Sequence, residues 1–137
     1  MDLAGSFSAL KANTVLLTPS VVKNVSREDM AGLKLLILAG EAIRPNDLRQ
    51  WWGRTRILPV YGSSECTTCV TVNSFASNLE QLSSIGKGTN AVTWIVDPEN
   101  PYRLLPPGCI GELLIESPLV CRGYLNDAVK EIGRAHV

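Results

Sequence analysis

The sequence has no excess of charge of either sign and no long hydrophobic run. Its 13 basic residues balance its 13 acidic ones, so we expect no binding to nucleic acid or to an anionic membrane. The longest apolar runs, such as residues 35–39, are far shorter than the roughly 20 residues that a membrane span needs. No positively charged leader precedes an apolar segment at the N-terminus, so no secretory signal is expected. These absences predict a cytoplasmic protein.

Cysteine and histidine are also scarce, with four and one respectively. Cys66 and Cys69 form a CxxC pair, but Cys109 and Cys121 do not supply the second close pair that a structural zinc site needs. A redox dithiol would begin a helix, whereas β-branched residues follow at 70–72. We therefore interpret Cys66 and Cys69 as small, partly buried side chains in a strand. A zinc or redox module is the least favoured interpretation.

The first sixty residues alternate between predicted strands and helices. Apolar runs at 14–18, 33–39 and 56–60 predict strands. The run at 33–39 is apolar at nearly every position, as in a parallel strand covered on both faces. Helices are expected to begin at Pro19, near Ser26 and at Pro45. The last of these would turn Leu48 and Trp51 or Trp52 inward and end at Gly53. This order predicts a parallel βαβ sheet with right-handed crossovers.

After residue 61, short strands are separated by glycine, proline and polar residues. Strands are expected at 66–73, 91–97, 111–115 and 120–124, with a polar loop at 74–84 and turns at 97–101 and 106–108. The predicted fold class is α/β, with the parallel part at about 1–73. A β-rich part at about 85–126 would form the antiparallel strands of a small barrel or sheet. We interpret residues 132–137 as translated sequencing adapter, which removes His136 from consideration and bounds the domain at 1–131.

Two loops follow predicted parallel strands, at the sheet edge where such folds bind ligands. Residues 61–65 suit a nucleoside triphosphate. Tyr61 offers a flat face, Gly62 allows close backbone approach, Ser63 and Ser64 can donate to phosphate oxygens, and Glu65 can hold Mg²⁺. The second loop, at 40–42, would form the other wall of a crevice. On spacing alone, an ordinary polar turn is the commoner explanation of each loop.

Four motifs occur in the order and spacing of the adenylate-forming enzymes. They are Leu35-Leu36-Ile37-Leu38-Ala39-Gly40-Glu41-Ala42, Val60-Tyr61-Gly62-Ser63-Ser64-Glu65, Ile85-Gly86-Lys87-Gly88, and Gly111-Glu112-Leu113-Leu114-Ile115 with Val120-Cys121-Arg122-Gly123-Tyr124-Leu125. From about residue 3 to residue 129, the chain most closely resembles the adenylation domains of nonribosomal peptide synthetases, of fungal type. By this resemblance, it is an internal slice of the larger N-terminal subdomain.

The resemblance implies a role for each loop residue. Gly40, Glu41, Ala42 and Tyr61 would surround the adenine, with Gly62 beside them in the nucleotide site. Ser64, where the family usually has threonine, would contact the α-phosphate, and Glu65 would be the Mg²⁺ ligand. Ser63 replaces a usual proline, which should loosen the loop. The stretch 111–124 is expected to be scaffold beneath the site, with Ser117 and Cys121 at positions where the family usually has glycine and alanine.

The resemblance also places the wall of a substrate pocket. Its residues would be Leu16, Ile37, Ala39, Val60, Thr68 and Cys69. Most of these are apolar or small, and a charged substrate side chain would be buried there without a partner, which is costly. The sequence therefore predicts a hydrophobic amino acid as substrate.

The reaction implied by the resemblance is amino-acid activation. Mg–ATP and the amino acid would give an aminoacyl-adenylate and pyrophosphate, and the acyl group would pass to a phosphopantetheine thiol. The expected partners are the carrier and condensation domains of a parent synthetase. The phosphate loop, the ribose-binding aspartate and the lid with its catalytic lysine would lie outside these residues, so the fragment alone is expected to be inactive. An acyl- or aryl-CoA ligase of the same superfamily and a non-catalytic nucleotide-fold interaction module remain alternatives.

Overall fold

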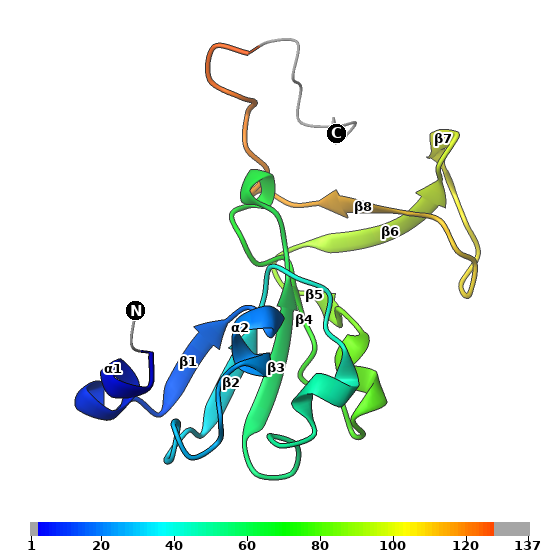
Figure 1. The fold of residues 1–137 in the computed structure, drawn as a ribbon. Helices are drawn as coiled ribbons and strands as arrows, with labels where there is room; N and C mark the ends of the chain where they lie inside the picture. Colours follow the sequence, from blue (N-terminus) through cyan, green and yellow to red (C-terminus); the bar gives the residue numbers. More distant parts are fainter. Residues whose placement is uncertain (1–2, 128–137) are drawn as a thin grey trace. The chain divides into compact units, whose positions relative to one another are not determined.

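The computed structural model describes residues 3–127, which fall into two compact units (Figure 1). Unit 1 comprises the described residues up to Tyr61 together with Val72–Gly86. Unit 2 comprises Gly62–Thr71 and the described residues from Lys87 onward. The proposed adapter tail and His136 lie outside the described residues. Within residues 3–127 there is no candidate for a membrane-crossing helix.

Unit 1 is built on three parallel strands. β1 (Thr14–Leu17), β2 (Leu35–Leu38) and β3 (Arg56–Tyr61) lie in that order, with Leu16 opposite Ile37 and Ile37 opposite Leu58. The three predicted strands and their parallel arrangement are thus confirmed. Helix α2 (Pro19–Lys23) begins at the predicted proline, whereas helix α1 (Leu3–Leu10) was not anticipated.

The core of unit 1 lies against one face of this sheet. Leu36 and Leu38 of β2 are fully buried, whereas Leu35 and Ile37 on the other face are only half-buried. The expectation that β2 is covered on both faces is therefore wrong for the described residues. An apolar run shows that a strand can be buried on both sides, but other segments decide whether it is. The core cluster comprises Phe7, Val22, Met30, Leu33, Leu36, Leu38, Leu48, Trp51, Ile57 and Leu82.

Two of the helices expected in unit 1 are shorter elements. The Ser26 backbone N–H and hydroxyl donate to Asp29 Oδ2 at 3.1 and 2.6 Å, and the Asp29 N–H donates to Ser26 Oγ at 3.1 Å. This reciprocal capping pattern closes a turn instead of opening a helix. From Pro45 the chain forms the 3₁₀ helix η1 (Pro45–Leu48) and then turns, although Leu48 and Trp51 are buried as predicted.

Unit 2 contains a three-stranded antiparallel sheet. Its strands β6 (Val92–Asp97), β7 (Asn100–Leu104) and β8 (Glu112–Glu116) lie in the order β7-β6-β8. The predicted strands at 91–97 and 111–115 are confirmed as β6 and β8. β7 is an edge strand, and this position tolerates Pro101 although proline lacks an N–H. Since β6 ends at Asp97 and β7 begins at Asn100, the turn predicted at 97–101 is shorter than expected.

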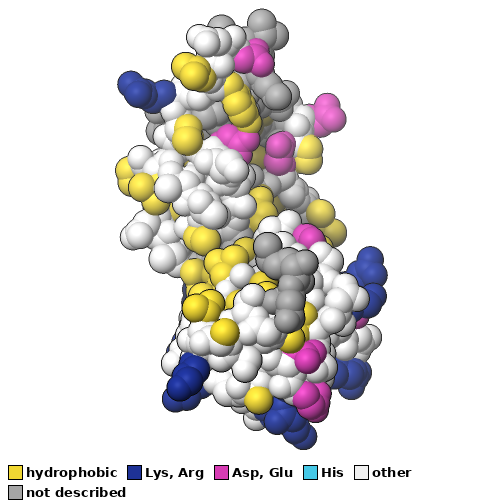
Figure 2. Space-filling view, turned by 60° about the vertical axis from the view of Figure 1, so that its left-hand side comes forward, with side chains coloured by type: hydrophobic (Ala, Val, Ile, Leu, Met, Phe, Trp, Pro, Cys, Tyr) yellow, Lys and Arg dark blue, Asp and Glu magenta, His cyan; other side chains and the backbone are white. Residues whose placement is uncertain are grey.

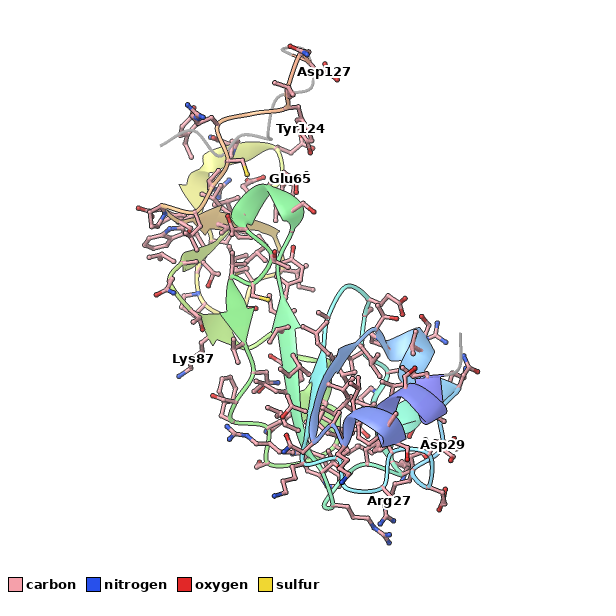
Figure 3. All side chains as sticks on the ribbon, turned by 90° about the vertical axis from the view of Figure 1, so that its left-hand side faces the viewer. Arg27, Asp29, Glu65, Lys87, Tyr124 and Asp127 are labelled. Atoms are coloured by element: carbon pink, nitrogen blue, oxygen red, sulfur yellow. The ribbon has the colours of Figure 1, made fainter. Side chains whose placement is uncertain are left out.

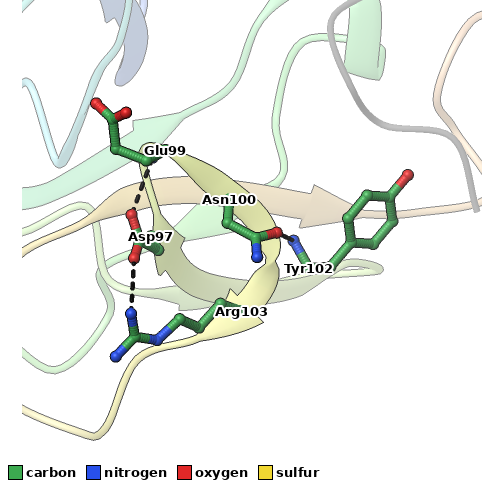
Figure 4. Close-up of polar contacts among 5 residues, drawn as sticks. All are labelled: Asp97, Glu99, Asn100, Tyr102 and Arg103. Atoms are coloured by element: carbon green, nitrogen blue, oxygen red, sulfur yellow. Dashed lines mark hydrogen bonds and ion pairs between the residues drawn. The ribbon is translucent and has the colours of Figure 1, made fainter.

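Side chains close the β6–β7 hairpin (Figure 4). The Asp97 carboxylate accepts a hydrogen bond from the Glu99 N–H at 2.9 Å and forms an ion pair with Arg103 at 3.3 Å. The Asn100 side chain accepts from the Tyr102 N–H at 3.1 Å. Aspartate and asparagine favour turns because their short side chains bond backbone groups two residues ahead.

The remaining described elements are short. They are the 3₁₀ helices η2 (Ser64–Cys66) and η3 (Glu80–Ser83) and the two-residue strands β4 (Thr71–Val72) and β5 (Lys87–Gly88). The strand predicted at 66–73 is thus reduced to β4. The strand predicted at 120–124 is absent from the described structure, where these residues form an irregular segment.

Candidate functional site

The loop at 40–42 follows β2 in unit 1 and is fixed to the start of α2. The Glu41 carboxylate accepts the Ser20 N–H at 2.9 Å through Oε2 and the Ser20 hydroxyl at 2.6 Å through Oε1. These two bonds lower the pKa of Glu41 below its ordinary value because they favour the ionised form. Gly40 has φ +84°, a conformation that side chains rarely adopt. The loop is therefore rigidly attached, and exposed Ala42 follows Glu41.

Several predicted pocket residues share one face of the unit 1 sheet. Leu16 lies opposite Ile37 across the β1–β2 ladder, and Val60 has the same orientation in β3 as Leu58, the partner of Ile37. Ala39 follows β2 by the same alternation, and its N–H donates to the Leu17 carbonyl at 3.3 Å. This face is opposite the core and is lined by exposed or half-buried apolar side chains, as a pocket wall requires.

Tyr61 ends β3 in unit 1, and Gly62 begins the unit 2 part of the same loop. Tyr61 is partly exposed, so its ring is available to a ligand. A Cβ at Gly62 would lie only 1.8 Å from the Thr68 carbonyl oxygen. This close backbone approach means that a side chain at position 62 would force the loop apart.

A tight turn over residues 63–69 carries Ser64 and Glu65. The Ser63 carbonyl accepts from the N–H groups of Cys66 at 3.1 Å and Thr68 at 3.0 Å. Thr67 and Thr68 have φ +55° and +77°, an uncommon conformation for β-branched residues. Such strained residues concentrate at functional sites, where surrounding contacts enforce them.

Because this turn occupies residues 63–69, the prediction of a strand around the CxxC pair is wrong. Cys66 is buried in η2, Thr68 is exposed in the turn, and Cys69 is half-buried after it. The β-branched composition favours a strand, but the hydrogen bonds of the turn override it. All four cysteines are free, and among residues 3–127 no group of three or more histidine, cysteine or acidic side chains could hold a metal by itself.

A distant segment of unit 2 holds this turn in place. The Cys121 N–H donates to the Glu65 carbonyl at 2.7 Å, and the Cys121 thiol donates weakly to the Ser64 carbonyl at 3.8 Å. The Thr67 hydroxyl donates to the Leu119 carbonyl at 2.9 Å. These contacts join residues 119 and 121 to the turn, whereas the scaffold role expected for the whole stretch 111–124 stays a prediction. We call residues 119–124 the clamp segment.

Tyr124 goes beyond scaffolding because its hydroxyl donates directly to Glu65 Oε1 (Figure 3). This bond is the largest cause that lowers the pKa of Glu65, with smaller contributions from the Glu65 backbone N–H and the Ser63 side chain. The same bond raises the pKa of Tyr124. Tyr124 is the site residue that the sequence interpretation missed, since a tyrosine 59 positions away carries no local signal.

The Glu65 side chain fits the requirements of Mg²⁺ bound to a nucleotide. It is half-buried, held in its ionised form and carried on a fixed turn. Mg²⁺ is usually bound through one or two carboxylates, with phosphates and waters completing its shell. One such carboxylate therefore suffices when a nucleotide supplies the other oxygens.

Unit 2 also contains an open groove of about 1000 Å³. Residues 90–92 and 115–122 line it. None of the predicted nucleotide or substrate contacts lines this groove, although Leu119 and Cys121 of the clamp segment do.

Known proteins give a consistent match to these features. A profile of the family described as AMP-binding enzyme matches residues 2–125. Nonribosomal peptide synthetase dtxS1 of Metarhizium robertsii is 54% identical over 129 residues, covering 94% of this chain and 2% of that protein. Peramine synthetase A of Epichloe festucae is 46% identical over 129 residues, covering 94% of this chain and 5% of that protein. The chain thus spans a small part of the relatives that it matches.

Solved structures support the fold. PA1221, described as a nonribosomal peptide synthetase protein containing adenylation and carrier (PCP) domains, matches with a TM-score of 0.77 at 21% identity, covering 94% of this chain and 28% of that chain. A long-chain-fatty-acid-CoA ligase from Archaeoglobus fulgidus matches with a TM-score of 0.75 at 19% identity, covering 93% and 29%. The predicted fold class and the resemblance drawn from the motifs are confirmed. The chain belongs to the AMP-binding enzyme family.

Proposed function

We propose that these residues are part of an adenylation domain that activates an amino acid with Mg–ATP. In the reaction, the amino-acid carboxylate attacks the α-phosphorus, and pyrophosphate leaves as the aminoacyl-adenylate forms. A phosphopantetheine thiol on a carrier domain then attacks the acyl carbon, which forms a thioester and releases AMP. The family match and the peptide synthetase relatives support this reaction class. The observation that carries the proposal is the hydrogen-bonded turn that holds the Glu65 carboxylate three residues after Gly62.

The proposed roles of the loop residues follow their chemistry. Tyr61 contacts the adenine with its exposed ring, and the Ser64 hydroxyl donates to the α-phosphate. Glu65 binds Mg²⁺, which would neutralise phosphate charge. Such reactions are accelerated mainly by positioning and by charge stabilisation. A side chain at position 62 would collide with the Thr68 carbonyl oxygen. Glycine at this position therefore lets the backbone pass close to Thr68 in the turn.

The loop at 40–42 is proposed to contact the adenine as well. The Glu41 carboxylate is already bonded to Ser20, so its contribution is to fix the loop and not to bind the base through its charge. Gly40 and Ala42 would then offer backbone and a small side chain to the base. This division of roles sharpens the expectation drawn from the sequence.

The substrate is proposed to be an amino acid with a hydrophobic side chain. The support is the apolar sheet face that carries Leu16, Ile37 and Val60. A charged side chain against this face would lose its hydration without gaining a partner. Thr68 and Cys69, which the resemblance also assigns to the substrate pocket, belong to unit 2 and stay proposed substrate contacts.

The carrier and condensation domains of a parent synthetase are the proposed partners, and a cytoplasmic location is proposed with them. The chain covers 2% of the Metarhizium robertsii synthetase. We propose that residues 1–137 alone do not adenylate, because the phosphate loop and the lid lysine expected from the resemblance are not among them.

The function is tested by exchanging segments. Residues 3–127 of this chain would replace the matching segment of the Metarhizium robertsii synthetase, and ATP–pyrophosphate exchange would be measured with a panel of amino acids. We expect exchange that favours hydrophobic amino acids and is lost in the Glu65→Gln chimera. Exchange with charged amino acids only would overturn the substrate class. A folded chimera that binds ATP but exchanges with no amino acid would overturn the reaction.

A further inference from the structure

The contacts between Glu65 and the clamp segment involve both the backbone and the side chain of the glutamate. Cys121 bonds the Glu65 carbonyl, and Tyr124 bonds its carboxylate. All three residues belong to unit 2. The backbone contact fixes where the glutamate is, and the side-chain contact fixes where its carboxylate points.

The Tyr124 hydroxyl is a suitable partner for a metal-binding carboxylate. An ionised carboxylate has about four lone-pair sites and only accepts hydrogen bonds. One bond from Tyr124 to Oε1 therefore leaves acceptor capacity for a cation. The bond also restricts the rotation of a long side chain that would otherwise lose its freedom when a ligand binds.

We propose that Tyr124 is a positioning residue that holds the Glu65 carboxylate in the orientation in which it binds Mg²⁺. This inference rests on the proposed metal role of Glu65. It assigns to the clamp segment a function in ligand binding in addition to its support of the turn. Loss of the partner that orients a metal ligand typically lowers metal affinity by about 10- to 100-fold.

The test uses the ¹⁵N-labelled 137-residue chain, Mn²⁺ as a paramagnetic probe and ATP to supply the phosphate oxygens that complete the metal shell. The measured quantity is the slope of amide line broadening against Mn²⁺ concentration at residues 63–67, which reports weak binding without any turnover. Amides near Asp97 serve as an internal reference for other carboxylates. Amide spectra without Mn²⁺ verify that each variant is folded away from the substituted position.

Four variants separate the possible roles. Tyr124→Phe removes only the hydroxyl, Tyr124→Ala removes the ring as well, and Glu65→Gln removes the charge. Tyr102→Phe is the matched control, since this tyrosine is 93% exposed on β7. We expect Tyr124→Phe to lower the slope at 63–67 by about 10- to 100-fold, as much as Tyr124→Ala does. Tyr102→Phe should leave it unchanged, and Glu65→Gln should reduce it to background.

Two results would overturn the inference in distinguishable ways. If Tyr124→Phe broadens like wild type while Tyr124→Ala does not, the ring supports the turn and the hydroxyl orients nothing. The proposed function would then survive without the positioning role. If Glu65→Gln broadens like wild type, Glu65 is not a metal ligand, and the metal role in the proposed function fails together with the inference.

Discussion

Unit 1 and unit 2 bury their apolar side chains to very different degrees. Every residue of the described core cluster lies in unit 1, where the sheet packs its inner face against helices and turns. Among its described residues, unit 2 buries few large apolar side chains, and many remain exposed; these include Val92, Trp94, Ile95, Tyr102, Leu104 and Ile110. Hydrophobic side chains are visible at the surface in Figure 2. Since apolar burial is the main stabilising contribution in folding, we infer that unit 1 supplies most of the stability.

The two units also differ in how each holds its candidate-site carboxylate, which is Glu41 in unit 1 and Glu65 in unit 2. Glu41 of unit 1 is bonded to Ser20, a residue 21 positions away in the neighbouring helix. Glu65 of unit 2 is bonded to Tyr124, 59 positions away. In unit 1, the loop that carries Glu41 is bonded to a helix that packs in the core. In unit 2, the turn that carries Glu65 is held in position mainly by hydrogen bonds to the clamp segment. The unit 2 turn should therefore be more sensitive to the loss of single polar contacts.

The largest expected change in the free energy of unfolding comes from the difference in burial between the units. It is tested with one leucine-to-alanine substitution in each unit. Leu38 is fully buried and Leu104 is 57% exposed. Leu38→Ala should lower the free energy of unfolding by about 2–5 kcal/mol because it leaves a cavity. Leu104→Ala should change it by at most about 0.5 kcal/mol. Urea denaturation measures both, and equal losses would show that unit 2 depends on apolar packing as much as unit 1 does.

The second prediction concerns the backbone approach at Gly62. Gly62→Ala should destabilise the chain by about 1–3 kcal/mol, because the added Cβ would meet a backbone carbonyl that cannot swing aside. The control is Gly108→Ala in the same unit, where no atom lies within 4 Å of an added Cβ. Its positive φ should cost about 1 kcal/mol. Amide shifts at 63–68 should move only in Gly62→Ala, and unchanged shifts there would contradict the tight turn.

The third prediction is a pH dependence carried by Glu41. Its pKa in the folded chain lies below the ordinary value of 4.5, because Ser20 donates to the ionised form. The stabilisation is thus present above the unfolded pKa and is lost as pH falls through the folded pKa. Glu41→Gln should unfold more easily than wild type near neutral pH, and the gap should close in acid.

Urea denaturation of both proteins between about pH 7 and about pH 3 measures this gap. Ser20→Ala is the matched variant, since it removes the hydroxyl donor to Glu41 but keeps the backbone donor. Its free energy of unfolding near neutral pH should lie between those of wild type and Glu41→Gln. A gap that stays constant down to the lowest pH would show that the Glu41 bonds do not depend on its charge.

The smallest expected effect lies at the β6–β7 hairpin of unit 2. The Arg103 side chain is 69% exposed in its ion pair with Asp97. Arg103→Ala should therefore lower the free energy of unfolding by at most about 1 kcal/mol, and less in high salt. Urea denaturation with and without added sodium chloride checks this. A larger loss, insensitive to salt, would mean that the hairpin stabilises unit 2 through packing of the arginine stem.

Local patterns were sufficient for much of the fold. The runs around β1, β2 and β3 and the alternation of β6 were recognised because burial and strand geometry act on neighbouring residues. The same local reasoning failed at 66–73 and at 120–124. There the residue types favour strands, but hydrogen bonds between the turn and the clamp segment impose irregular conformations.

The candidate site shows the same division. The chemical character of Tyr61, Ser64 and Glu65 was apparent from their types and order, and a resemblance across four motifs indicated the family. The attachment of Glu41 to Ser20 and the positive φ of Thr67 could not be foreseen. Folding alone brings Ser20 close to Glu41, and it also brings Leu119 within hydrogen-bond distance of the Thr67 hydroxyl.

By itself, the sequence determined the parallel strands, the antiparallel strands β6 and β8 and the loop that carries the proposed nucleotide contacts. Periodicity, turn residues and side-chain chemistry are properties of neighbouring residues, so they can be recognised without coordinates. Only the tertiary structure decided which face of β2 is buried, how Glu41 is held and that Tyr124 bonds Glu65. These depend on contacts between residues far apart in the chain, and no local pattern encodes such contacts.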